Sequence, residues 1–394
     1  MTVVHVSHAS PSPLPHRGRA AVRVAVAAVL LAALGGCAVL DWFGPDRPEP
    51  KPLPAITQPI APRAAWTQSI GAVRFPLAVA VDAGTLVLAA SDGTVAAIEA
   101  ATGRSLWRSN VGARITAGVG SDGTRSAVVT EQGDLVVLEG GEVKWKSPLG
   151  TRVSTAPLVA GGRVFVLGVD RAVQAFDGQD GARLWRVARP GDPLTLSQAG
   201  VLTAVRDTLV VGQGPRLAGF DPAGTSLRWE AVVGSPRGAN EIERLADLVG
   251  PVVRAGDTVC ARSFQAAVGC VDARAGRAIW TKAVGGVSAI GGDGELVFGG
   301  DASDRLAAWK TASGDVAWSS EDLMHRGLGP PGALGGSVVF GDRDGTLHWL
   351  SRADGKTQAR VPTDGSPTAA APVTVGDTLV VTTRNGGVFA WRGS

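Results

Sequence analysis

The chain has 394 residues, of which 45% are hydrophobic, 19% are charged and 54 are glycine. This composition excludes a disordered chain and is typical of a folded domain rich in glycine. The formal net charge is +3, but residues 1–36 contain three arginines and no acid, which leaves 35 of the 38 basic residues against 35 acidic ones. A balanced charge favours neither DNA nor RNA, so we expect no nucleic-acid partner.

The first predicted element is a secretory leader over residues 1–36. Three arginines between residues 17 and 23 precede an uncharged stretch, residues 24–34, which has the length of a signal-peptide core and is too short to span a bilayer. Leu34, Gly35, Gly36 and Cys37 follow, and this sequence resembles a bacterial lipobox. We therefore expect lipidation of Cys37 and cleavage before it; the alternative is a plain signal peptide that contains a cysteine.

A lipidated Cys37 predicts a protein that is anchored to a membrane without spanning it. In the lipoproteins that the leader resembles, an aspartate just after the cysteine favours the inner membrane, but here Ala38 follows and the nearest acid is Asp41. The expected location is the periplasmic face of the outer membrane. Residues 38–63 contain seven prolines, so we expect residues 37–63 to form the anchor and an extended tether.

A tryptophan-centred repeat dominates the rest of the chain. A tryptophan with a glycine five or six residues later recurs six times from Trp66 to Trp280, Trp318 lacks the following glycine, and Ala359 stands where an eighth tryptophan would be. The repeated positions are 66, 107, 145, 185, 229, 280, 318 and 359, with spacings of 38 to 51 residues. This is the period of a propeller blade.

Each repeat predicts four short antiparallel strands. A glycine four residues before most of the tryptophans supplies the positive φ of a tight hairpin, and a second hairpin precedes it. Three strands follow Ala359, while Trp66 supplies a single strand at the other end. We therefore predict an all-β, eight-bladed β-propeller over residues 64–394, whose ring is closed by N- and C-terminal strands. The tryptophans are expected to pack between blades.

The tryptophan repeat resembles the pyrroloquinoline-quinone (PQQ) type of propeller, whose enzyme members are dehydrogenases. The leader, the blade count and above all residues 235–253, SPRGANEIERLADLVGPVV, instead resemble the BamB family of outer-membrane lipoproteins. This resemblance extends from the lipobox to Trp391. It implies a non-catalytic scaffold of the β-barrel assembly machinery, the BAM complex, which binds the periplasmic POTRA domains of BamA, works with other BAM subunits and helps to insert outer-membrane proteins.

The resemblance also implies contact residues. Members of the family contact BamA through two leucines followed by an arginine, and through two acids in the later segment. Leu194 and Leu196 match the leucines, whereas Ser197 stands at the position of the arginine. Asp247 matches the first acid, and Val249 replaces the second.

The repeat pattern, without the resemblance, agrees on where these residues lie. The connection after Trp185 contains the two leucines, and the connection after Trp229 is the longest. Both join the outer strand of one blade to the inner strand of the next, so we expect them side by side on one face of the ring.

Within the longer connection, Ile242, Leu245 and Leu248 recur every third residue, and one helical turn would place them on one side. With Arg244 and Asp247 beside it, this apolar stripe is either a partner-binding hot spot or a cover for the propeller's own surface.

Catalytic and metal-binding motifs have little support. A quinone-dependent dehydrogenase would be expected to carry two adjacent cysteines, which are absent, and His325 and His348 are far apart and lie in no zinc-binding motif. We expect no enzyme activity, no cofactor and no metal, with a PQQ-dependent periplasmic dehydrogenase as the alternative. A further expected partner is unfolded outer-membrane protein, added to blade edges by β-augmentation.

Cys260 and Cys270 come to lie nearly opposite each other if the fifth blade folds about residues 264–265. Two readings remain open for this pair: a disulfide, which an oxidising periplasm favours, or two free thiols in the core.

Overall fold

The computed structural model describes residues 48–57, 59–189, 194–236, 238–241 and 243–393. The chain divides into two compact units, Met1–Glu49 and Pro50–Ser394, and the second is the propeller. The expected leader, Cys37 and the first part of the tether lie outside the described residues. No helix in the described ranges has both the length and the apolar character needed to cross a membrane.

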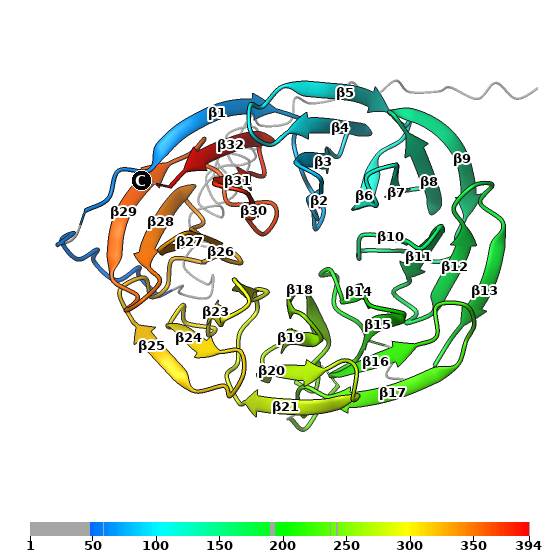
Figure 1. The fold of residues 1–394 in the computed structure, drawn as a ribbon. Helices are drawn as coiled ribbons and strands as arrows, with labels where there is room; N and C mark the ends of the chain where they lie inside the picture. The colour runs from blue at the N-terminus through cyan, green and yellow to red at the C-terminus, as the bar shows by residue number, and fades with distance from the viewer. Residues whose placement is uncertain (1–47, 58, 190–193, 237, 242, 394) are drawn as a thin grey trace, which may run out of the picture. The chain divides into compact units, whose positions relative to one another are not determined.

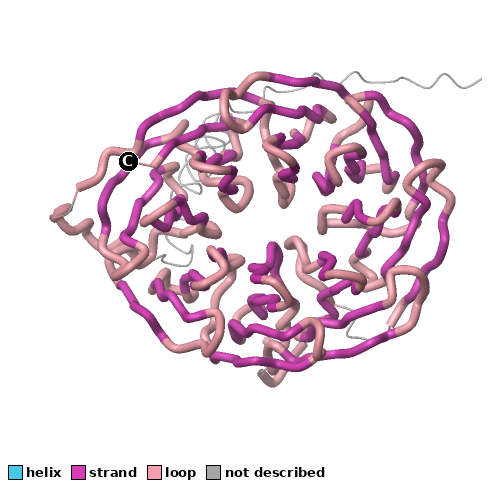
Figure 2. Tube along the Cα trace, viewed as in Figure 1, coloured by secondary structure: helices cyan, strands magenta, loops and turns pink. Residues whose placement is uncertain are grey.

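Eight four-stranded antiparallel sheets form the ring (Figures 1 and 2). Blade one is β2 (Ala80–Asp82), β3 (Thr85–Ala89), β4 (Thr94–Glu99) and β5 (Ser105–Asn110); blade two is β6 (Ile115–Ser121), β7 (Arg125–Thr130), β8 (Asp134–Glu139) and β9 (Glu142–Pro148); blade three is β10 (Leu158–Ala160), β11 (Arg163–Leu167), β12 (Val173–Asp177) and β13 (Arg183–Val187); blade four is β14 (Leu202–Val205), β15 (Thr208–Gln213), β16 (Arg216–Phe220) and β17 (Leu227–Val232).

Blade five is β18 (Leu248–Ala255), β19 (Thr258–Ser263), β20 (Ala267–Asp272) and β21 (Arg277–Lys282); blade six is β22 (Gly291–Gly292), β23 (Leu296–Gly300), β24 (Leu306–Lys310) and β25 (Val316–Ser320); blade seven is β26 (Gly332–Leu334), β27 (Ser337–Gly341), β28 (Thr346–Ser351) and β29 (Thr357–Pro362); blade eight is β30 (Val373–Val375), β31 (Thr378–Thr382), β32 (Gly387–Arg392) and β1 (Arg63–Ser69). The first-named strand of each blade lies nearest the centre of the ring (Figure 1).

The predicted fold is confirmed, including the way in which the ring closes. The N-terminal strand β1 pairs antiparallel with the C-terminal strand β32 and forms the outer strand of blade eight. Backbone hydrogen bonds thus join the two ends of the propeller, and no blade is left incomplete.

The repeated tryptophans join neighbouring blades. Each of the seven lies on an outer strand, and in five of them the indole Nε1 donates a hydrogen bond to a backbone carbonyl of the next blade. The donor and acceptor pairs, at 2.8–3.3 Å, are Trp66 and Ala100, Trp145 and Gly178, Trp185 and Pro222, Trp280 and Thr311, and Trp318 and Arg352. The structural role expected of the tryptophans is therefore confirmed for these junctions.

The glycine four residues before most repeat positions has the backbone role that the sequence predicted and a packing role that it did not. Gly355, four residues before Ala359, shows both. Gly355, in the hairpin that precedes the outer strand of blade seven, has the expected positive φ of 73°. In addition, a Cβ atom at this position would overlap the ring of Trp318 from blade six. The hairpin therefore needs glycine both for its backbone conformation and for close packing on the preceding tryptophan.

Two glycine substitutions in blade seven separate the backbone role from the packing role. Gly335 also has a positive φ, 56°, but a Cβ atom there would meet nothing within 4 Å. We expect Gly335→Ala to lower the free energy of unfolding by about 1 kcal/mol through backbone strain alone. Gly355→Ala should cost a further ~1–3 kcal/mol because it also displaces Trp318. Equal losses in denaturant unfolding would contradict the packing role.

Blade seven is the exception to the tryptophan rule, and the ring closure explains it. Blade eight takes its outer strand from the N-terminus, so it has no hairpin to receive a tryptophan from blade seven. Ala359 occupies the repeat position, and Ile60, from the segment before β1, packs against the core cluster that contains Ala359 and Trp391. The Ile60 amide also donates to the carbonyl of Gln358 at 3.2 Å.

The segment before β1 is attached at two further points, one on the connection between blades six and seven and one on blade seven. Arg326 donates to the carbonyl of Lys51 at 2.8 Å, and Arg360 donates to the carbonyl of Pro54 at 2.6 Å. The described part of residues 50–62 thus belongs to the propeller. The compact unit that contains the propeller begins at Pro50, so part of the predicted tether contacts the propeller ahead of its first strand, β1.

Truncating Ile60 tests this attachment. We expect Ile60→Ala to lower the free energy of unfolding by about 1–2 kcal/mol, since the side chain is half-buried against the core. Leu53→Ala is the matched control, because Leu53 lies in the same segment and is 38% exposed. Thermal or denaturant unfolding in which both variants behave like the native chain would argue against the role of Ile60.

Cys260 on β19 and Cys270 on β20 are direct partners in the strand register. The structure joins them by a disulfide, and both residues are fully buried beside Trp280 and Trp309. The pair therefore lies in the core between blades five and six.

Candidate functional site

Three connections from consecutive blades meet on one face of the ring, which we call the loop face. They are the β11–β12 hairpin, residues 168–172, the β13–β14 connection, residues 188–201, and the β17–β18 connection, residues 233–247. Because each blade has four antiparallel strands, every connection between blades starts and ends on this face. The predicted proximity of the second and third connections follows from this geometry.

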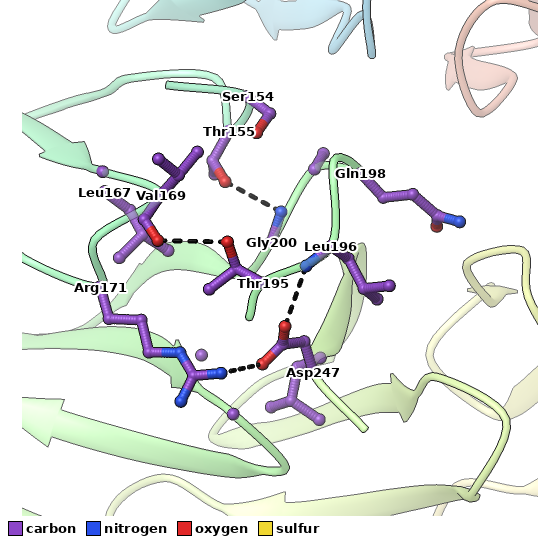
Figure 3. Close-up of a pocket in the computed structure, with 15 residues that line it drawn as sticks. Ser154, Thr155, Leu167, Val169, Arg171, Thr195, Leu196, Gln198, Gly200 and Asp247 are labelled. Carbon is purple, nitrogen blue, oxygen red and sulfur yellow. Dashed lines mark hydrogen bonds and ion pairs between the residues drawn. The ribbon is translucent and has the colours of Figure 1, made fainter. Parts of the chain in front are cut away.

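Asp247 holds the three connections together (Figure 3). Its Oδ1 accepts a hydrogen bond from Arg171 Nη2 at 2.9 Å, and its Oδ2 accepts one from the backbone N–H of Leu196 at 3.1 Å. The same Arg171 nitrogen also donates to the carbonyl oxygen of Leu194 at 3.1 Å. A single carboxylate and a single guanidinium thus set the backbone position of the loop that carries the two leucines.

This ion pair is sheltered from solvent. The side chains of Arg171 and Asp247 are 16% and 15% exposed, whereas most other ion pairs of the described chain include a partner that is far more exposed. Partial burial reduces screening by water and salt, so the pair holds its geometry better than a surface pair does.

Further hydrogen bonds fix the loop of residues 194–200. Thr195 Oγ1 donates to the carbonyl of Val169 at 3.2 Å, and Thr155 Oγ1 accepts from the backbone N–H of Gly200 at 2.9 Å (Figure 3). The cavity beneath the loop has a volume of about 50 Å³. This volume is water-sized and far below the roughly 300–1,000 Å³ of small-molecule pockets, so the loop surface, and not a pocket, is the candidate site.

The predicted contact residues differ in their exposure. Leu194 is 40% exposed and Ser197 is exposed, while Leu196 is half-buried. The Asp247 side chain is mostly buried and bonds to the loop backbone, so it positions the loop of Leu194 and Leu196 and contributes little exposed surface itself. Val249 is 3% exposed within β18, so its side chain presents nothing to a partner.

The longer connection forms only part of the expected turn. Asn240 Oδ1 accepts from the Glu243 backbone N–H at 2.8 Å, Glu243 Oε2 accepts from that of Ala239 at 2.8 Å, and the Arg244 N–H donates to the Asn240 carbonyl at 3.1 Å. These reciprocal bonds cap a single turn. Arg244 is exposed and Leu245 is half-buried, while Ile242 lies outside the described residues.

The expected apolar stripe does not include Leu248. This residue begins strand β18, pairs with Ser263 and is 3% exposed in the core. A three-residue spacing indicates one helical face only while the helix continues, and here strand pairing begins instead. Leu248 therefore covers the propeller's own core.

Sequence reasoning missed Arg171. It lies 76 residues from Asp247, in a hairpin whose backbone has an unusual φ of 59°. A non-glycine residue at the tip of a tight hairpin was the only local signal, and nothing in the sequence connects it with Asp247.

The fold and the site define an eight-bladed β-propeller whose candidate site is built from blade-connecting loops. A family model described as "Outer membrane protein assembly factor BamB" matches residues 91–320. The protein of that name from Burkholderia pseudomallei (strain K96243) is 36% identical over 384 residues, which covers 95% of this chain and 98% of the relative. That of Bordetella pertussis (strain Tohama I) is 33% identical over 374 residues, covering 94% and 97%. The chain therefore belongs to the BamB family.

Solved structures agree on the fold. The crystal structure of BamB from Moraxella catarrhalis matches with a TM-score of 0.75 at 22% identity, over 84% of this chain and 100% of that one. Quinohemoprotein alcohol dehydrogenase from Comamonas testosteroni matches with a TM-score of 0.63 at 16% identity, over 84% and 76%. At these identities the likeness extends to the fold alone.

Removing the Asp247 carboxylate tests its positioning role. Asp247→Ala leaves the half-buried Arg171 without its counter-ion and the Leu196 N–H without its acceptor, and we expect a loss of about 1–3 kcal/mol in the free energy of unfolding. Hydrogen exchange at Leu196 should become faster. Glu131→Ala is the control: the Glu131 and Arg114 side chains are 48% and 66% exposed, and removing such a pair should cost at most ~1 kcal/mol. Unchanged exchange at Leu196 would contradict the role.

Proposed function

We propose that this protein is a non-catalytic scaffold of the BAM complex that binds the POTRA domains of BamA through the loop face at blades three to five. The observation that carries the proposal is the Asp247 and Arg171 pair, which positions a loop with an exposed leucine, Leu194. A pre-positioned apolar side chain with polar neighbours is typical of the centre of a protein interface, because little loop entropy is lost on binding.

Two departures from the family pattern shape the proposed interface. Ser197 is exposed and uncharged where the family has an arginine, and Val249 is buried where it has an acid. The contact proposed here therefore depends more on Leu194, Leu196, Leu245 and Arg244 than on charge pairing. A contact of this kind should depend weakly on salt concentration.

The proposed location is the periplasmic face of the outer membrane, with Cys37 carrying the lipid anchor. The proposal rests on the leader sequence and on membership of a family named for outer-membrane protein assembly. The disulfide between Cys260 and Cys270 is consistent with an oxidising periplasm. Neither cysteine is among the residues that line the cavity at the centre of the ring, so the pair offers no support for the dehydrogenase alternative.

The decisive experiment measures binding of the protein without its leader, residues 38–394, to the periplasmic region of BamA from the same organism. We expect Leu194→Ala to weaken binding by about tenfold or more, as for an interface hot spot, and Leu194→Ala/Leu196→Ala to weaken it further. Leu184→Ala should bind like the native protein, because Leu184 is similarly exposed, at 46%, but lies on β13, the outer strand of blade three.

The possible results separate the partner from the site. Absence of binding by the folded native protein would overturn the proposed function. Native binding that both leucine variants retain would keep the partner and overturn the loop face as its site.

A further inference from the structure

A cavity of about 700 Å³ occupies the centre of the ring. Its size is within the roughly 300–1,000 Å³ range of small-molecule sites. It is lined by residues of the inner strands and of the connections between blades, and the proposed partner loops touch it only at residues 198–201. Most of the cavity wall is therefore separate from the proposed BamA contact.

The walls of this cavity, which we call the central channel, are mainly apolar. Side chains that line it come from blades around the whole ring and include Leu77, Val201, Val252, Val287, Leu328 and Pro330. Val287 is 41% exposed although it belongs to this wall. Exposed apolar surface inside a cavity favours an occupant with an apolar body.

The charge of the lining has one sign. Among the described lining residues, only Arg343 and Arg384 are charged. They occupy matching places in neighbouring blades, since Arg343 follows β27 and Arg384 follows β31, each in the hairpin before the third strand. Two cations and no anion at a cavity with low-dielectric walls attract a negatively charged group.

These two arginines differ from Arg171, which occupies the corresponding hairpin of blade three and is neutralised by Asp247. Within the described chain, no carboxylate oxygen lies within 4 Å of the guanidinium of Arg343 or Arg384. Asp342, beside Arg343, is instead buried and bonded to His348 at 2.9 Å. The other acid of that hairpin, Asp344, is exposed and does not line the channel.

We propose that the central channel binds a single-chain amphiphile with an anionic head group. The carboxylate or phosphate of the head is held by Arg343 and Arg384, whose planar guanidinium groups suit either anion. The apolar chain lies against the wall that includes Val252 and Val287. This site is independent of the proposed BamA contact, because neither arginine belongs to the partner loops.

Titration calorimetry with residues 38–394 tests the proposal, using probes below their micelle concentrations. Dodecyl phosphate and laurate represent the two anionic heads, dodecyltrimethylammonium carries the same chain with a positive head, and inorganic phosphate has no chain. We expect saturable one-to-one binding of at least one of the two anionic amphiphiles, and no comparable binding of the cation or of phosphate.

Three variants locate the site. Arg343→Gln/Arg384→Gln should weaken binding of the anionic amphiphile by about tenfold or more, through loss of two charge-assisted contacts. Val287→Glu, which places a negative charge on an exposed wall position, should weaken it similarly. Arg114→Gln is the control, because Arg114 belongs to a connection on the same face but does not line the channel. Melting curves verify that all variants are folded.

The proposal is overturned if neither dodecyl phosphate nor laurate binds to the native protein, or if the cationic amphiphile binds equally well. It is also overturned if the double arginine variant and Val287→Glu bind the anionic probes as tightly as Arg114→Gln does. A loss confined to the arginine and Val287 variants supports it.

Discussion

The contact between a tryptophan of one blade and the glycine hairpin of the next is the interaction on which this propeller depends. Each blade is a small sheet with little core of its own, so its stability comes from burial against its neighbours. The indole of Trp318 supplies both a large apolar surface and a donor for the Arg352 carbonyl, while Gly355 allows the two backbones to approach. Repetition of this contact around the ring yields a rigid frame.

The rigid frame explains why loops that are distant in the chain can form one surface. Connections between blades all emerge on the loop face, and the closed ring holds blades three, four and five in fixed positions. Arg171 and Asp247 can therefore meet, although 76 residues separate them. Their bond in turn holds the backbone of Leu194 and Leu196. The position of the exposed Leu194 thus depends on Arg171 and Asp247, which belong to other connections, as well as on its own loop.

The same frame creates two environments for hairpin arginines. In blade three the arginine is paired with Asp247 and ties loops together. In blades seven and eight Arg343 and Arg384 line an apolar channel, and neither guanidinium forms an ion pair within the described part of the chain. The ring closure adds a local exception of its own. Blade eight takes its outer strand from the N-terminus, and Ile60, which precedes that strand, packs against the cluster that contains Ala359 and Trp391.

The sequence by itself determined the all-β class, the eight blades, the closure by both termini and the two adjacent loops, because these follow from a repeat that can be counted. Tertiary structure alone decided the pairing of Asp247 with Arg171, the docking of Ile60 and the burial of Leu248 at the start of β18. Local periodicity reports which residues share a face within one element. Contacts between side chains of different blades depend on how the blades close into a ring, which no local pattern encodes.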